Sequence, residues 1–182
     1  MILKIGSTDD LPKAAAAILE SLDGRSVVAF RGEMGAGKTT LLAHVRTLID
    51  PEIPILDIPQ ELDAGQRAAV LTRAAALSDA ERGSVLSTVA QLNSRPDRIL
   101  EGDRTSPGEL RKLMLALGML DRPELIIMDE PTNHLDLHST EALERALAAY
   151  PGALLLVSHD HAFLDACTDR IWEVSGGVVR EA

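Results

Sequence analysis

The sequence has few aromatic residues, one cysteine and a deficit of positive charge. Aromatic residues make up 2% of the 182 residues, so the core must be built from aliphatic side chains. Cys167 is the single cysteine, which excludes an intrachain disulfide or a multi-cysteine zinc site and fits a reducing compartment. With 28 acidic and 18 basic residues the net charge is −10, which disfavours generic nucleic-acid binding.

Long apolar runs are also absent. No run approaches the roughly 18 residues of a transmembrane helix, and residues 1–10 lack the basic region and apolar stretch of a signal peptide. A chain of 182 residues, 46% hydrophobic and 25% charged, can bury the core of one domain but not comfortably of two. We therefore expect one cytoplasmic domain over residues 1–182.

Apolar segments alternate with helical patterns, which predicts an α/β fold. Helices are expected from Asp10, before Pro12, to Gly24, and over about 41–50. From about 62 to 120 no strand pattern occurs, so an inserted helical subdomain is expected there. Strands buried on both faces at the centre of a mostly parallel sheet are predicted at 26–30, 53–58, 125–129 and 153–157, with a terminal hairpin over 170–179.

A glycine-rich loop follows the first predicted strand. Its fixed residues Gly32, Gly37, Lys38 and Thr39 have the spacing of a phosphate-binding loop, and a helix pattern comes next. In such a loop backbone N–H groups surround the β-phosphate, the lysine reaches the β- and γ-phosphates, and the threonine ligates Mg²⁺. A plain glycine-rich turn is the weaker alternative. The predicted nucleotide-binding residues are Gly32, Glu33, Met34, Gly35, Ala36, Gly37, Lys38, Thr39 and Thr40.

Two carboxylates end the strand predicted at 125–129. Asp129 and Glu130 are therefore expected at the carboxyl edge of a parallel sheet, where ligands bind in this fold class. Asp129 would hold Mg²⁺ and Glu130 would act as a general base toward water. An acidic helix cap is the alternative, which the nearby phosphate loop disfavours.

Three further segments carry a family resemblance. They are Ser106-Pro-Gly-Glu109, Pro131-Thr-Asn-His-Leu-Asp136 and Ser158-His159-Asp160. With the phosphate loop they resemble the ATP-binding cassette, a P-loop NTPase fold, and residues 105–163 resemble its ABC-F branch, whose members act on ribosomes as pairs of fused cassettes. Pro59-Gln60-Glu61 is similar to the glutamine loop of the family, so the resemblance covers about residues 53–179.

The resemblance implies ATP and Mg²⁺ as cofactors and ATP hydrolysis as the activity. It assigns Gln60 to sensing Mg²⁺ and the lytic water, His159 to the γ-phosphate, and Asp136 to communication across a dimer. Ser106 and Gly108 of one cassette would face the nucleotide held by Lys38 of the other. By this likeness the catalytic residues are Gln60, Glu130 and His159, the metal ligands are Thr39, Gln60 and Asp129, and the remaining nucleotide contacts are Ser106, Gly108 and Asp136.

The signature segment departs from the commonest cassette pattern at two positions. Thr105 replaces leucine, and Pro107 replaces the first glycine and removes one backbone donor. The residue types still predict a helix start, with Ser106 as the cap, Pro107 at the first helical position and Glu109 closing a capping box. Such an N-terminus favours an anion, although a purely structural cap is the alternative.

The first 50 residues resemble a different protein, the small bacterial ATPase that assists threonylcarbamoyladenosine modification of transfer RNA. No aromatic residue precedes Phe30, so the aromatic residue that stacks on adenine in cassettes has no counterpart there. The sequence therefore does not decide whether the bound base is adenine or guanine. Only 22 positions separate Lys38 from Gln60, which predicts a reduced antiparallel subdomain.

Two classes of function follow. The first is an ATPase acting as a nucleotide-driven dimerisation switch, with a second copy or another cassette as partner. The second is a nucleotide-binding regulatory or assembly partner with little ATPase activity, and an accessory ATPase of transfer RNA modification is a further alternative. The first class is favoured because the sequence has all the residues expected to bind nucleotide and catalyse hydrolysis, namely Lys38, Thr39, Gln60, Asp129, Glu130 and His159. Ribosome action is not expected of this chain alone, because it has one cassette, no long basic linker and a net charge of −10.

Overall fold

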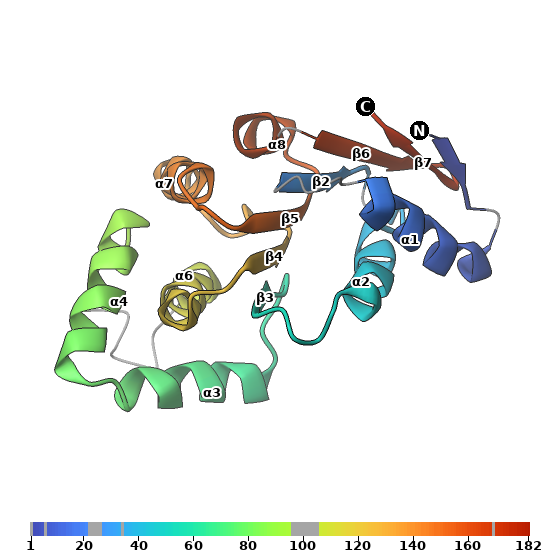
Figure 1. Ribbon diagram of the computed structural model, residues 1–182. Helices are drawn as coiled ribbons and strands as arrows, with labels where there is room; N and C mark the ends of the chain where they lie inside the picture. The colour runs from blue at the N-terminus through green and yellow to red at the C-terminus, as the bar shows by residue number, and fades with distance from the viewer. Residues whose placement is uncertain (1, 6, 22–26, 34, 96–105, 169) are drawn as a thin grey trace.

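The computed structural model describes residues 2–5, 7–21, 27–33, 35–95, 106–168 and 170–182 (Figure 1). One seven-stranded sheet, in the order β1-β7-β6-β2-β5-β4-β3, runs through the molecule. This confirms the predicted α/β fold. The strands are β1 (Ile2–Lys4), β2 (Val27–Arg31), β3 (Ile55–Ile58), β4 (Leu125–Asp129), β5 (Ala153–Ser158), β6 (Arg170–Ser175) and β7 (Val178–Glu181).

Most of the sheet is parallel, as predicted. Strands β6, β2, β5, β4 and β3 pair in parallel, whereas β7 pairs antiparallel with β6 and with β1. The predicted C-terminal hairpin is confirmed as β6 and β7. Strand β1 was not predicted, because three residues carry too little periodicity. It forms by antiparallel pairing with the adjacent strand β7, where Ile2 lies opposite Arg180.

Strand β3 corrects one prediction. It is the edge strand, and it begins at Ile55 rather than at residue 53. Ile55 is 39% exposed and Asp57 is also exposed, whereas Leu56 and Ile58 are buried. The prediction that 53–58 lies at the centre, buried on both faces, is therefore wrong. Alternation of exposed and buried residues is the pattern of a strand covered on one face.

Helices cover both faces of the sheet (Figure 1). One face packs on α1 (Leu11–Ser21) and α2 (Lys38–Leu48), and the other on α6 (Pro107–Gly118), α7 (Leu137–Ala148) and α8 (His161–Cys167). The predicted first helix is confirmed: a 3₁₀ turn, η1 (Thr8–Asp10), leads into α1, while its expected end at Gly24 lies outside the described residues.

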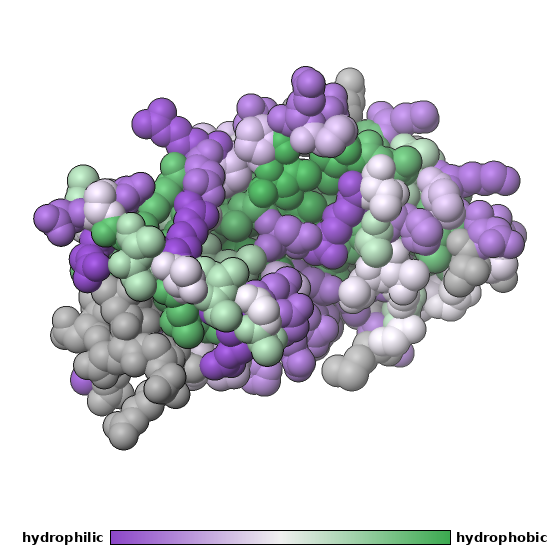
Figure 2. Space-filling model, turned by 90° about the horizontal axis from the view of Figure 1, so that it is seen from below, coloured by the Kyte–Doolittle hydropathy of each residue, from purple (hydrophilic) through white to green (hydrophobic). Residues whose placement is uncertain are grey.

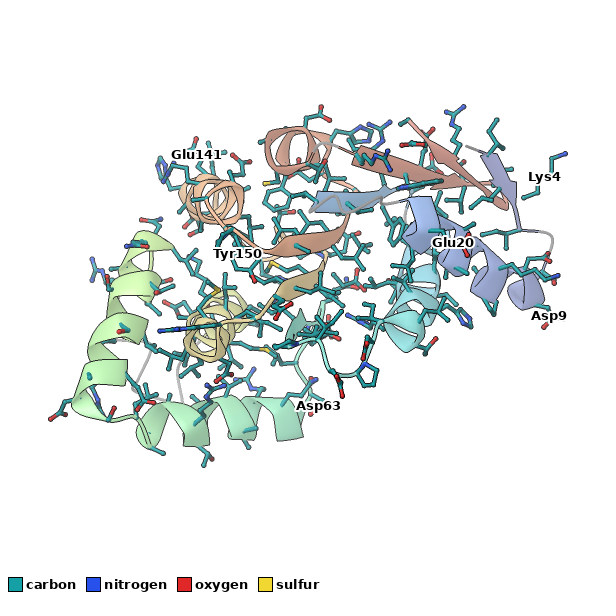
Figure 3. The ribbon with its side chains drawn as sticks, in the orientation of Figure 1. Lys4, Asp9, Glu20, Asp63, Glu141 and Tyr150 are labelled. Atoms are coloured by element: carbon teal, nitrogen blue, oxygen red, sulfur yellow. The ribbon has the colours of Figure 1, made fainter. Side chains whose placement is uncertain are left out.

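A third core joins the inserted helices α3 (Ala64–Ala75) and α4 (Asp79–Gln91) to α6, which leads into η2 (Met119–Asp121). Asp63 caps α3 (Figure 3), and Ser78 forms a capping box with Glu81 on α4. Within 62–120 the described residues contain no strand, so the helical prediction is confirmed there; 96–105 lie outside them. In the part of the chain that is described, no helix is long and apolar enough to cross a bilayer.

Apolar side chains remain open to solvent on the face shown in Figure 2. A hollow of about 330 Å³ lies between α1, α2 and the starts of β4 and β5, and its lining includes Ile18, Val45 and Leu125. Leu48 and Ile53 at this hollow are 46% and 36% exposed. The hollow is at the amino ends of the parallel strands, opposite the edge where α/β sheets bind ligands.

Candidate active site

The phosphate loop connects β2 to α2, and its glycines are needed for two different reasons. Gly35 and Gly37 have φ values of +81° and +90°, a region that side chains disfavour. A Cβ on Gly32 would lie 2.2 Å from the backbone oxygen of Val174 in β6. The loop therefore depends on conformation at two glycines and on close backbone approach at the third. Met34 lies outside the described residues.

Gly32→Ala is expected to destabilise the fold and weaken nucleotide binding. Either the loop or β6 must move to admit the methyl group, at a cost of about 1–3 kcal/mol. For a chain of this size each kcal/mol lowers the melting temperature by roughly 2–4 °C. Gly83→Ala in α4 is the matched control, because an added Cβ there would meet nothing within 4 Å. Unchanged melting and nucleotide affinity in Gly32→Ala would contradict the proposed close approach.

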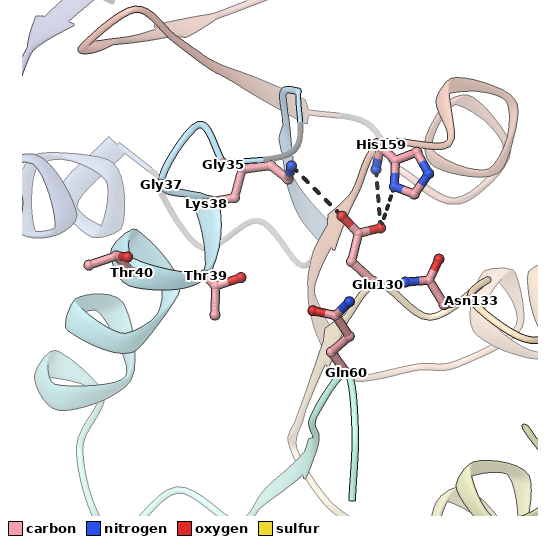
Figure 4. A pocket seen from close by; sticks show the side chains of 9 residues that line it. All are labelled: Gly35, Gly37, Lys38, Thr39, Thr40, Gln60, Glu130, Asn133 and His159. Carbon is pink, nitrogen blue, oxygen red and sulfur yellow. Dashed lines mark hydrogen bonds and ion pairs between the residues drawn. The ribbon is translucent and has the colours of Figure 1, made fainter. Parts of the chain in front are cut away.

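Glu130 lies between a cation and an imidazole (Figure 4). Lys38 is 6% exposed, and its Nζ donates to the backbone oxygens of Gly32 at 2.7 Å and Glu33 at 3.0 Å. The same Nζ is 3.7 Å from Glu130 Oε1, while His159 Nδ1 is 2.8 Å from Glu130 Oε2. The carboxylate is held at both oxygens, in a position from which it can accept a proton from water.

Asp129 has the features of a Mg²⁺ ligand. It is 3% exposed, and burial raises its pKa most, against the lowering effect of a Thr39 hydrogen bond. Among the described residues, no hydrogen-bond partner reaches Asp129 Oδ1. An unpartnered buried carboxylate oxygen beside a hydroxyl fits Mg²⁺, which takes one or two protein oxygens together with phosphate oxygens and water. A larger ligand cluster is not needed, and the described residues contain no group of three His, Cys, Asp or Glu able to hold a metal.

Asp129→Asn is expected to stabilise the fold at neutral pH and to weaken Mg²⁺-dependent nucleotide binding. A carboxyl with a raised folded-state pKa destabilises the fold above that pKa, because its charged form is the poorly solvated one. An amide removes about 1 kcal/mol of this cost, or roughly 2–4 °C in melting temperature. The gain should shrink as the pH falls and Asp129 itself becomes neutral. Asp165→Asn, on an exposed position, is the control.

One cavity brings eight of the predicted residues together. Its volume is about 390 Å³, and it forms where the ends of β3, β4 and β5 meet the phosphate loop. Four predicted residues, Gly32, Glu33, Ala36 and Asp129, lie next to residues that line the cavity but do not line it themselves. The residues that line it are Gly35, Gly37, Lys38, Thr39, Thr40, Gln60, Glu130, Asn133 and His159.

Three predicted residues lie elsewhere. Ser106, Gly108 and Asp136 line a separate cavity of about 210 Å³. Ser106 caps α6 with the predicted capping box, and Asp136 caps α7 by accepting the Ser139 N–H at 2.7 Å, a bond that lowers the pKa of Asp136. Within one chain these residues are not brought to the phosphate loop.

Sequence reasoning missed three residues of the site region. Asn133 lines the nucleotide cavity, and its position in the segment 131–136 could have indicated it. Arg111 and Lys112, on α6, are both buried, at 5% and 7% exposed. Two adjacent cations on a helix suggest an exposed face, so the pattern gave no warning of their burial.

Comparison with known proteins decides the family. The profile of the family described as ABC transporter matches residues 19–133, more than half of the chain. The chain belongs to this family. Among relatives, the Putative ATP-binding protein YdiF of Bacillus subtilis is 33% identical over 165 residues, covering 84% of this chain and 26% of the relative. The Energy-dependent translational throttle protein EttA of Mycobacterium tuberculosis is 49% identical over 72 residues, covering 40% and 13%.

Solved structures agree on the fold. The ATP binding subunit of an ABC transporter superposes with a TM-score of 0.62 at 24% identity, covering 86% of this chain and 78% of that one. The ABC-F resemblance is confirmed by relatives such as EttA and the ATP-binding protein Uup of Caulobacter vibrioides, 33% identical over 161 residues (82% of this chain, 26% of the relative). This ABC ATPase domain spans about a quarter of the length of YdiF and Uup. The likeness of residues 1–50 to the transfer RNA modification ATPase stays a prediction.

Proposed function

We propose that this ABC-F-like cassette binds ATP with Mg²⁺, hydrolyses it, and uses bound nucleotide to associate with a second cassette. The observation that carries the proposal is the single cavity in which Lys38, Thr39, Gln60, Glu130 and His159 meet. These side chains come from four separate segments, so a plain glycine-rich turn does not account for their convergence. Anion-binding loop, metal-binding oxygens and a general base are the parts that phosphoryl transfer to water requires.

Each residue has a role that follows from its contacts. The loop amides and Lys38 would hold the phosphates. Thr39 and Asp129 would hold Mg²⁺, and Gln60 lines the same cavity as Thr39. The metal supplies charge neutralisation on the phosphate oxygens. Glu130 takes the proton of the attacking water. His159, which the family resemblance assigned to the γ-phosphate, contacts Glu130 at 2.8 Å and so orients the base.

The second cavity supports association. Ser106 and Asp136 are exposed, and the N-terminus of α6 carries a partial positive charge that favours a phosphate. Neither residue lines the cavity at the phosphate loop of its own chain. A nucleotide bound at the phosphate loop of one cassette would therefore reach Ser106 and Asp136 by lying between that cassette and a second one. We therefore propose a composite site in which Ser106 and Gly108 of one copy face the nucleotide of another.

A steady-state ATPase assay over a hundredfold range of protein concentration tests the proposal. The rate per chain should rise with concentration if two copies form the site. A constant nonzero rate would keep hydrolysis and overturn association between copies. No turnover despite measured ATP binding would overturn hydrolysis and favour the nucleotide-binding partner with little ATPase activity.

A further inference from the structure

A buried arginine lies directly behind the two carboxylates. Arg111 is 5% exposed, and its Nη2 donates to the backbone oxygen of Asp129 at 2.9 Å. Its Nη1 donates to the backbone oxygen of Glu130 at 3.0 Å. The planar guanidinium thus binds two successive carbonyls, a geometry that its fixed fork of donors suits and a lysine cannot reproduce.

The backbone that Arg111 holds has an unfavourable conformation. Glu130 has a φ of +48°, in the left-handed region that residues other than glycine rarely adopt. Such a residue costs roughly 1–3 kcal/mol and persists where its surroundings fix it. Here the Glu130 N–H donates to Val157 O at 2.7 Å, and Glu130 O accepts from both Arg111 and the Asn133 N–H, at 3.2 Å for the latter.

Packing alone does not explain a guanidinium at this place. Burial lowers the pKa of Arg111, which shows that the charge is poorly solvated, while the nearby Asp129 and Glu130 carboxylates oppose that shift. Its Nε has no partner among the described residues. An apolar side chain of similar volume would fill the space with less desolvation, so the arginine contributes chiefly through its two carbonyl contacts.

We propose that Arg111 is a positioning residue for hydrolysis. By holding the carbonyls of Asp129 and Glu130, it maintains the turn that places the Glu130 carboxylate between Lys38 and His159. The inference rests on the proposed function and adds a residue of α6 to the machinery of the nucleotide cavity. Arg111 touches neither the cavity nor a reacting atom, so it acts through Glu130.

Three variants test the inference. Arg111→Met removes both carbonyl contacts at similar volume, and Arg111→Lys restores the charge and part of the contact. Ala116→Gly is the matched control, since it weakens the same helix by about 1 kcal/mol at a buried site. Ala116 is one of the residues of the third core, on the side of α6 that packs on α3 and α4.

Turnover and nucleotide affinity are expected to separate. Arg111→Met should lower kcat at least about thirtyfold, because small displacements of a catalytic group are costly, with the ATP dissociation constant within threefold. Arg111→Lys should recover part of the loss, and Ala116→Gly should keep kcat within twofold. In the Glu130→Gln background, Arg111→Met should cause no further loss in single-turnover rate, whereas a general structural defect would multiply the losses.

The outcomes distinguish this inference from the proposed function. If the unaltered chain turns over ATP and Arg111→Met stays within twofold of it, the positioning role is overturned. If the unaltered chain binds ATP without turnover, the proposed hydrolysis fails instead. In that case hydrogen exchange of the amides of residues 129–135 tests whether Arg111 holds the turn at Glu130. Faster exchange in Arg111→Met than in Ala116→Gly supports the positioning role, and equal exchange overturns it.

Discussion

Glu130→Gln is expected to abolish turnover while ATP binding survives. The amide has the size of the carboxylate but cannot take a proton from water, so kcat should fall by about 10²–10⁴. The loop glycines, Lys38, Thr39 and Asp129 are unchanged, and the amide oxygen can still accept from His159, which lies 2.8 Å from the carboxylate. Removing negative charge near Lys38, 3.7 Å away, leaves its ammonium freer to contact phosphate.

The same variant should accumulate an ATP-bound dimer. If bound nucleotide links two cassettes and hydrolysis releases them, blocking hydrolysis shifts the equilibrium toward the associated form by mass action. Size-exclusion chromatography with light scattering, with and without MgATP, measures this directly. Glu20→Gln, on the exposed part of α1 (Figure 3), is the control and should behave as the unaltered chain.

Two results would count against these expectations separately. Turnover within tenfold of the unaltered chain would remove Glu130 from the role of general base. A strictly monomeric peak at saturating MgATP would rule out association between copies of this chain. It would leave either a different cassette as the partner or a monomeric mode of action, as the resemblance of the first 50 residues suggests.

Local features of the fold and site were predictable because they are encoded in neighbouring residues. Glycine spacing specifies the phosphate loop, and the capping residues Ser78 and Ser106 specify the starts of α4 and α6. An apolar run ending in Asp129 and Glu130 was enough to place two carboxylates at the ligand-binding edge of a parallel sheet.

Features that depend on distant partners were not predictable. The edge position of β3 follows from strand order, which periodicity does not encode, although Asp57 within the strand was a signal of one exposed face. The burial of Arg111 depends on backbone carbonyls 18 and 19 residues away. Every residue carries a carbonyl, so no residue type marks such a partner in a sequence.

The contact of His159 with Glu130 also depends on a partner that is distant in the sequence. The family resemblance assigned His159 to the γ-phosphate, and the structure places its Nδ1 on Glu130 Oε2. His159 lies at the end of β5 in both cases, and the sequence predicted that position correctly. The neighbour that the imidazole contacts, however, depends on the turn after β4. That turn includes Glu130 at a φ of +48°, a conformation that glutamate rarely adopts and that the sequence therefore does not indicate.

Lys38→Ala is expected to abolish nucleotide binding and, with it, association. The Lys38 ammonium is buried at the phosphate loop, and a charge-assisted hydrogen bond to phosphate is worth about 1.5–3 kcal/mol in this type of setting. Because the variant cannot donate to either the β- or the γ-phosphate, the ATP dissociation constant should rise at least about hundredfold. Lys13→Ala, at an exposed position of α1, is the charge-matched control.

The loop itself should also loosen in Lys38→Ala. Lys38 Nζ donates to the backbone oxygens of Gly32 and Glu33, so its removal frees two carbonyls. The Glu130 carboxylate also loses its ion pair with Lys38 and keeps its contact with His159. Isothermal titration with MgATP measures the affinity, and chromatography of the same samples measures association. Dimers of Lys38→Ala that form without bound nucleotide would show that association is not nucleotide-driven, whereas ATP affinity within fivefold of the unaltered chain would overturn the assignment of the phosphate site to Lys38.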